Sequence, residues 1–308
     1  MMARTVLAIA ALLVAHGALA GAPDAHQFGV VGHSFANGSG EAQLRQALAE
    51  GVDQADAFVV VTGVKSGVEP CSDKLYEQRR ALLDEARRPV IAALAASDWS
   101  ECRNSAGRSA AIERLNRLRE LYFAESASLG TARKLALTRQ SSNPKFRSYA
   151  ENAYWIVGKV LYATVNLPAN NNHYRPEAGR NSEFEDRLVA NRFWLNRLFA
   201  LAQRHKLDAL VLFSEGDVKA LKQAVGLGAL LARATDRQDG FAEPRRQIGT
   251  LAQKFKGRVL LVDTAPGSAE PAIEWRANLG HLSVGGGAVE VRVTPGTELL
   301  FTLKDANR

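Results

Sequence analysis

Short apolar runs alternate with amphipathic patterns in the first third of the chain, and this alternation constrains the fold more than any other sequence feature. Residues 27–33, 57–61 and 89–94 are largely apolar and rich in β-branched side chains, which predicts three buried strands. Between them, residues 41–50 and 73–87 place apolar side chains at helical spacing. Strands that alternate with helices in this way favour a parallel or mixed sheet covered by helices. We therefore expect an α/β fold.

The second half of the chain is richer in strands. Its apolar runs predict further strands within residues 154–166, 210–213 and 258–262, the first of these runs forming a hairpin. Ser182 and Glu185 have the spacing of a capping box, which predicts the start of a long helix. No repeat or linker divides the chain, so we expect a single domain with strands in both halves.

The N-terminus has the layout of a secretory signal peptide. Arg4 supplies a positive charge, residues 6–15 are an unbroken apolar run, and residues 18–20 (Ala-Leu-Ala) form a small-x-small cleavage site. A membrane-spanning helix needs about 20 apolar residues, so this run is too short for one. We expect residues 1–20 to be removed on export and residues 21–308 to form the mature domain, in the periplasm or outside the cell. The alternative is a buried N-terminal helix.

Composition narrows the possible partners. Hydrophobic residues make up 46% of the chain and charged residues 23%, which is a globular balance. The 39 basic side chains exceed the 32 acidic ones, and so small an excess attracts anions only weakly. No basic run is interleaved with aromatic residues, so we expect no nucleic-acid partner. No stretch after the signal peptide is apolar and long enough to predict a membrane span.

The chain has two cysteines, Cys71 and Cys102. An exported protein meets an oxidising compartment, so we expect this even pair to form a disulfide. Such a bond would contribute about 3 to 4 kcal/mol in the chain-entropy model. Two free buried thiols are the alternative. A catalytic thiol is disfavoured, because neither cysteine lies in a Cys-x-x-Cys pair or beside a histidine.

Polar motifs follow the predicted strands of the first half, which is where open α/β sheets place their chemistry. The most distinctive are residues 65–67 (Lys-Ser-Gly), 70–73 (Pro-Cys-Ser-Asp) and 99–102 (Trp-Ser-Glu-Cys). Further pieces of the same framework are residues 151–153, 170–172, 191–194 and the final strands. This framework resembles an exported bacterial branch of the calcineurin-like metallophosphoesterases over most of the mature chain. The resemblance implies a four-layer α/β/β/α sandwich with mixed sheets.

Catalysis in that family uses two divalent ions that bridge a water and clamp the phosphoryl group for in-line attack. The resemblance implies ligands in the order Asp-x-His, Gly-Asp, Gly-Asn-His-Asp/Glu, a later His and Gly-His-x-His. Here His33 stands where the first Asp belongs, and Phe35 stands where its His partner belongs. Residues 62–64 (Thr-Gly-Val) offer no carboxylate in place of Gly-Asp. The bridging ligands of the resemblance are therefore missing.

The later ligand positions differ as well. Residues 95–98 read Ala-Ala-Ser-Asp, and the loop 214–217 (Ser-Glu-Gly-Asp) contains no histidine. Asp263 falls where a histidine is expected, and no Gly-His-x-His follows it. Metal affinity depends on the number and charge of the ligands, so losing most of them together removes the site. We expect the protein to hold no metal and no other cofactor.

Polar side chains nevertheless remain at the predicted strand tips. The candidates for a vestigial cleft are His33, Asp98, Glu215 and Asp263. A histidine with carboxylates can hold one cation or shuttle protons, so a rebuilt single-metal or acid/base site is one interpretation. The favoured interpretation is that these residues are helix caps and solvated turns, with Asp217 as the N-cap of a helix beginning at Val218.

Four further residues are expected to have structural roles. Lys65 and His173 are predicted to lie at the surface, and Trp155 and Trp194 in the core. We therefore expect an exported phosphoesterase-fold protein that is not catalytic and binds a small anion or an envelope protein. A metal-dependent phosphoesterase or other hydrolase with a rebuilt site is the alternative. An envelope protein that uses the fold only as a scaffold is a third possibility.

Overall fold

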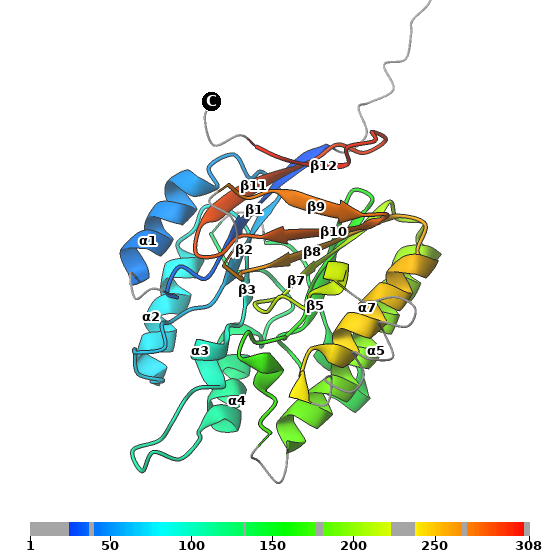
Figure 1. Cartoon of the computed structure of the whole chain (residues 1–308). Coiled ribbons are helices and arrows are strands. Elements are labelled where there is room, and N and C mark those ends of the chain that lie inside the picture. Colours follow the sequence, from blue (N-terminus) through cyan, green and yellow to red (C-terminus); the bar gives the residue numbers. More distant parts are fainter. Residues whose placement is uncertain are drawn as a thin grey trace, which may run out of the picture.

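The structure is a computed structural model that describes residues 25–36, 40–131, 134–176, 181–222, 238–266 and 270–304. It contains two mixed β-sheets with helices packed against them, so the expected α/β class is confirmed (Figure 1). The predicted signal peptide lies outside the described residues. None of the helices within the described ranges has the length and apolar character needed to cross a membrane.

The first sheet has five strands in the order β12-β11-β1-β2-β3. Its central strands come from the apolar runs of the first half, and their pairing is parallel, with Val30 opposite Val60 and Val60 opposite Ile91. The two C-terminal strands add to the β1 edge in antiparallel orientation. The strands span β1 His26–Val31, β2 Phe58–Thr62, β3 Val90–Ala93, β11 Ala288–Val293 and β12 Phe301–Leu303.

The second sheet has seven strands in the order β4-β5-β6-β7-β8-β10-β9. Strands β6, β7, β8 and β10 are parallel, and β5 joins β6 through a tight turn at Gly158, which confirms the predicted hairpin. The strands span β4 Thr138–Arg139, β5 Ala153–Val157, β6 Val160–Thr164, β7 Ala209–Phe213, β8 Arg258–Asp263, β9 Ile273–Arg276 and β10 Leu279–Ser283.

The helices follow the amphipathic patterns closely. Ser72 caps α2 as predicted, because its side chain accepts a hydrogen bond from the Leu75 amide at 3.3 Å. The capping box predicted at Ser182 is wrong. The N-cap of α5 is Asn181, whose side chain binds the backbone of Arg175 instead. The helices are α1 Gly40–Gln46, η1 Ala47–Gly51, α2 Asp73–Asp84, α3 Ala96–Trp99, α4 Ala111–Tyr122, α5 Ser182–Arg204 and α7 Ala242–Lys254, with short 3₁₀ turns η2 Gln140–Ser142, η3 Pro144–Phe146, η4 Asn171–His173 and η5 Ala220–Lys222.

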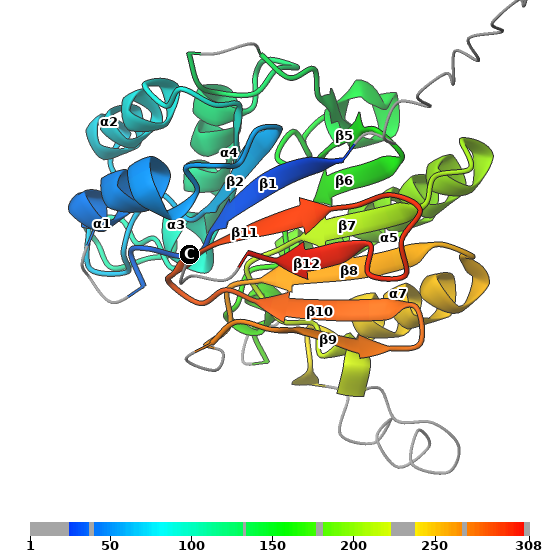
Figure 2. The same cartoon turned by 90° about the horizontal axis from the view of Figure 1, so that it is seen from above.

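The two sheets face each other across a shared aromatic core. Phe58 from β2 packs edge-to-face on Tyr162 of β6, with ring centroids 4.7 Å apart, and on Trp155 of β5 at 5.2 Å. Successive side chains of a strand point to opposite faces. The alternate residues of β2 therefore pack against α1, α2 and α4, and those of β7 pack against α5 and α7. Figure 2 shows these two groups of helices on opposite flanks of the sheets.

Three predicted features of the core and the loops are confirmed. Trp155 and Trp194 are both buried. The sulfur atoms of Cys71 and Cys102 lie at disulfide distance, with their Cα atoms 5.9 Å apart. This bond ties the loop after β2 to the loop after β3, and both loops lie at the carboxyl ends of the first sheet's parallel strands.

Candidate functional site

Loops from both sheets meet at the carboxyl ends of the parallel strands. His33 follows β1, Asp98 lies in the short helix α3 after β3, and Glu215 follows β7. The structure brings these three predicted residues together. His33 and Asp98 follow strands whose carboxyl ends share one edge of the first sheet, and the facing second sheet brings Glu215 to them. All three side chains are buried, and Asp98 is fully enclosed. Asp263, the fourth predicted residue, belongs to a neighbouring cluster.

The imidazole of His33 links the loops of the two sheets. Its Nδ1 atom lies 3.6 Å from Oε1 of Glu215, and its Nε2 atom lies 3.2 Å from both the Lys65 carbonyl and Oγ of Ser97. The ring packs directly on Gly63, where an added Cβ would come within 2.3 Å of the imidazole. Gly63 also has a φ of +77°, so a larger residue there would be both strained and displaced by His33.

The carboxyl group of Asp98 joins the backbone of the loop after β2 to that of the loop after β3. Its Oδ1 atom accepts hydrogen bonds from the amides of Val64 at 2.9 Å and Lys65 at 3.1 Å, and its Oδ2 atom accepts one from Ala95 at 2.7 Å. Burial raises the pKa of Asp98 above its usual value, although His33 and these amides favour the charged form. The contact with Ala95 is the helix cap expected for Asp98, but the expected solvated position is wrong, because the side chain is fully enclosed.

Glu215 joins the two halves of the site. Its Oε2 atom accepts hydrogen bonds from the amides of Ala96 at 2.6 Å and Ala169 at 2.7 Å. Burial raises the pKa of Glu215 to about 8, against the opposing effect of these two amides. The carboxyl group therefore holds its proton near neutral pH. Metal ligands must be deprotonated, so Glu215 is poorly suited to that role.

Lys65 is buried, so the expectation that it lies at the surface is wrong. Its Nζ atom donates to the carbonyl of Ser66 at 2.5 Å and to that of Ser97 at 2.8 Å. Burial lowers the pKa of Lys65, and the nearby Asp98 opposes this shift. The amino group therefore makes hydrogen bonds within the protein. The sequence could not indicate this, because the conformation of the loops places both carbonyl groups near Nζ.

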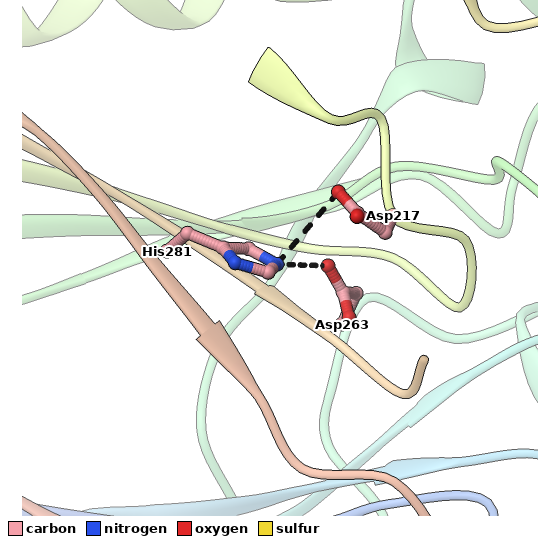
Figure 3. Close-up of side chains that lie close together, drawn as sticks. All are labelled: Asp217, Asp263 and His281. Carbon is pink, nitrogen blue, oxygen red and sulfur yellow. Dashed lines mark hydrogen bonds and ion pairs between the residues drawn. The ribbon is translucent and has the colours of Figure 1, made fainter. Parts of the chain in front are cut away.

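Asp263 ends β8 and faces His281 of β10 (Figure 3). Oδ2 of Asp263 lies 2.6 Å from Nε2 of His281, and the same nitrogen lies 3.7 Å from Oδ1 of Asp217. Oδ1 of Asp263 accepts from Oγ of Ser283 at 2.7 Å and from the Ala265 amide at 3.0 Å. His281 was not among the predicted residues, because nothing in the sequence shows that β10 pairs with β8.

Charge around His281 favours its protonated form. Burial opposes the charged imidazole, but Asp263, Asp217 and Glu274 outweigh burial and raise the pKa of His281 above its usual value. Asp217 accepts a hydrogen bond from the Lys219 amide at 2.5 Å, which is a capping contact ahead of the 3₁₀ turn η5. The helix predicted to follow Val218 is therefore only this turn within residues 218–222, and residues 223–237 are outside the described ranges.

His173 is also buried, so its predicted solvated position is wrong. Its Nδ1 atom lies 3.0 Å from Oε2 of Glu183. Burial opposes the charge of Glu183, but the buried Arg187 and His173 outweigh it and lower the pKa of Glu183 to about 2. Residues 171–173 all have positive φ, between 52° and 53°, which costs backbone strain. The buried Arg187 holds this loop through the side chain and carbonyl of Asn172.

A polar cavity of about 500 Å³ opens between this loop and the loop after β3. Two exposed arginines, Arg103 and Arg175, line it, and neither forms an ion pair with any described residue. Asn170 and Ser100 join its two sides through a hydrogen bond of 2.9 Å. The cavity lies beside the strand-tip residues without including them.

Comparisons with known proteins add little. No family model matches the sequence, and no curated protein matches it. Among solved structures, the chain is similar to a hypothetical protein from Thermus thermophilus, with 13% identity and a TM-score of 0.39 over 84% of this chain and 76% of that one. A score this low carries no argument about fold family or function. The resemblance to calcineurin-like metallophosphoesterases therefore stays a prediction.

Proposed function

We propose that the chain is an exported protein of the calcineurin-like phosphoesterase type that has lost its two-metal centre and binds a small anion without hydrolysing it. Two facing sheets with helices on opposite flanks support the four-layer order that the resemblance implies. The disulfide between Cys71 and Cys102 supports an oxidising compartment such as the periplasm or the extracellular space.

The observation that carries this proposal is that the strand tips are closed by their own hydrogen bonds. The two carboxyl oxygens of Asp98 accept hydrogen bonds from three backbone amides, and Oε2 of Glu215 accepts two more. Nζ of Lys65 donates to two carbonyl groups. A metal bound here would have to displace several of these bonds at once. Each buried amide left without an acceptor costs about 1 to 3 kcal/mol, which opposes metal entry.

Charge leads to the same conclusion. A two-metal centre brings together four positive charges and needs anionic ligands to hold them. Here a histidine stands in place of the first carboxylate, and burial keeps Glu215 protonated near neutral pH. Residues 62–64 supply no carboxylate at the position where the bridging one belongs. The site therefore lacks the negative charge that two divalent ions require.

A small anion fits the neighbouring cavity better than a protein partner does. Guanidinium groups bind phosphate and carboxylate groups through paired N–H donors. Arg103 and Arg175 line a cavity of about 500 Å³ and have no acidic partner among the described residues. Arg103 donates to the Gly107 carbonyl through Nη1 at 2.9 Å, which leaves its other N–H groups for such contacts. The strained loop 171–173, held rigid by Arg187, forms one wall of the cavity.

Two measurements test this proposal on the mature chain. We expect no hydrolysis of bis(4-nitrophenyl) phosphate with or without manganese, while an active metallophosphoesterase assayed in parallel turns it over. We also expect calorimetry to show binding of inorganic pyrophosphate that is lost in Arg103→Ala with Arg175→Ala and kept in the surface control Arg204→Ala. Turnover that disappears in Asp98→Ala would overturn the proposal.

The alternative function is a metal-dependent hydrolase with a rebuilt site. One observation favours it, namely that Asp217, Asp263 and His281 bring three metal-type ligand atoms within 4.8 Å of one another. In that case the same assay would show turnover that depends on added metal and is lost in His281→Gln.

A further inference from the structure

Three side chains from separate elements converge beside the strand tips. His281 comes from the middle of β10, Asp263 ends β8, and Asp217 lies in the loop after β7 (Figure 3). We propose that Asp217, Asp263 and His281 bind one divalent transition-metal ion, for which zinc is the best match. Imidazole nitrogen and carboxylate oxygen are both ligands that zinc accepts.

The geometry suits a single ion with open coordination positions. Nε2 of His281 lies 2.6 Å from Oδ2 of Asp263 and 3.7 Å from Oδ1 of Asp217, and all three atoms are within 4.8 Å of one another. Ligand atoms in a tetrahedral zinc site are about 3.3 Å apart at metal–ligand distances of about 2.0 Å. A shift of the imidazole by about 1 Å would thus accommodate the ion. Three protein ligands leave a fourth position for water.

Unbalanced charge is the independent reason to expect a cation here. Among the described residues, His281 is the only ion-pair partner of Asp217 and of Asp263, and no lysine or arginine lies within 4.0 Å of either carboxylate. One imidazolium balances one of the two carboxylates. Asp263, which is only 3% exposed, makes the closer contact with the imidazole, so the carboxylate of Asp217 is the one left without a balancing charge. A divalent ion with a neutral His281 balances both.

The surroundings hold the ligands in place. Ser283 and the Ala265 amide bind Oδ1 of Asp263, which leaves Oδ2 turned to His281. Outer contacts of this kind orient ligands in metal sites. The side chains of His281 and Asp217 are each 19% exposed, so an ion can reach the cluster from solvent.

This site differs from the one that the family resemblance implies. Asp263 and the loop that carries Asp217 fall where that resemblance expects histidine ligands, whereas His281 does not. His33, Asp98 and Glu215 take no part. The ion would fix the end of β8, β10 and the loop after β7 together, so we infer a structural role. The loop also carries Glu215, whose carbonyl accepts a hydrogen bond from the Thr264 amide at 3.1 Å. The inference does not depend on the proposed anion-binding function.

The test is metal binding by the mature chain after treatment with EDTA. We expect calorimetry to show one zinc ion per chain, and added zinc to raise the midpoint of thermal unfolding because it binds only the folded state. His281→Gln and Asp217→Asn should each weaken binding more than about tenfold, since even outer contacts of metal sites contribute that much. His205→Gln, which changes an exposed histidine at the end of α5, should bind zinc as the unchanged protein does.

Cobalt provides a second measurement that does not depend on activity. Cobalt bound to His281 and the two aspartates should give visible absorption, and this signal should be absent in His281→Gln. Zinc affinity weaker than millimolar, or equal affinity in His281→Gln and in the unchanged protein, would overturn the inference. Hydrolysis of bis(4-nitrophenyl) phosphate would instead overturn the proposed function and leave this site standing.

Discussion

Two polar clusters lie next to each other at the carboxyl ends of the strands, and the loop after β7 supplies one acid to each. Glu215 enters the first cluster with His33 and Asp98, and Asp217 enters the second with Asp263 and His281. In the first cluster, backbone amides satisfy the carboxyl oxygens. In the second, backbone amides bind one oxygen of each carboxylate, and the two carboxylates share one histidine. The comparison teaches that a polar cluster whose carboxyl groups are buried and hydrogen-bonded excludes metal ions. A cluster with more carboxylates than positively charged side chains can bind a cation.

Removing the disulfide should have the largest effect on the free energy of unfolding. It should not affect metal binding at the second cluster. Replacing both Cys71 and Cys102 by serine should lower the free energy of unfolding by about 3 to 4 kcal/mol, because the unfolded chain gains freedom. Urea denaturation measures this loss. Zinc binding at Asp217 and His281 should be unchanged in the folded variant. An equal loss of zinc affinity would mean that the clusters are not independent.

Asp98→Ala should cause the second-largest loss in the free energy of unfolding. It leaves three buried amides without an acceptor, at about 1 kcal/mol or more each, so unfolding should become easier by about 3 kcal/mol. Asp217→Ala is the matched control from the second cluster and should cost less than about 1 kcal/mol in metal-free protein. Urea denaturation of the two variants side by side measures the difference. Equal losses would contradict the contrast between a closed and an open cluster.

The pH dependence of stability should identify Glu215. Burial raises the pKa of Glu215 to about 8 in the folded protein, from an ordinary value of 4.5. Between these values the unfolded chain releases a proton that the folded protein keeps, so stability falls as pH rises, by up to about 1.4 kcal/mol per pH unit. Glu215→Gln removes this titration, so the free energy of unfolding should fall less steeply with pH in the variant.

The control for this titration is Glu298→Gln, which changes an exposed glutamate and should leave the pH profile unchanged. Urea denaturation of the three proteins between about pH 5 and 8 gives the comparison. Parallel profiles for Glu215→Gln and the unchanged protein would show that Glu215 is already ionised across this range.

His281→Gln should have the smallest effect in metal-free protein. The imidazole is partly exposed, and ion pairs of that kind contribute about 0 to 1 kcal/mol. In saturating zinc, the same substitution should cost more, because the unchanged protein gains the binding energy. Thermal unfolding with and without zinc measures both values. A large loss without metal would indicate that the His281–Asp263 pair is structural by itself.

Much of the fold could be predicted from the sequence, because its core strands are apolar runs of ordinary length. Residues 57–61 and 259–262 show no polar interruption, and each range lies in a buried strand or at its start. The placement of His33 and Asp98 at one edge of the first sheet follows from the same argument, since both follow its parallel strands. In these cases the sequence pattern predicts the strands, and the order of the strands then predicts which loops lie at the same edge. The contact with Glu215 depends on how the second sheet faces the first, which the pattern does not show.

The remaining features depend on contacts between distant segments. His281 lies on a strand with weak apolar character, and only its pairing with β8 brings it to Asp263. Lys65 and His173 are polar residues in loops, and their burial comes from carbonyl groups and a carboxylate supplied elsewhere in the chain. The local sequence pattern does not show which distant groups a residue will contact. For this reason the sequence did not identify His281 and predicted the wrong environment for Lys65 and His173.

The most direct test of the contrast between the two clusters is the metal content of the mature chain. Elemental analysis after dialysis against zinc and manganese should find one ion per chain, and a lower metal content in His281→Gln. Two ions per chain that are lost in Asp98→Ala would contradict it, because they would place a dinuclear centre at the strand tips.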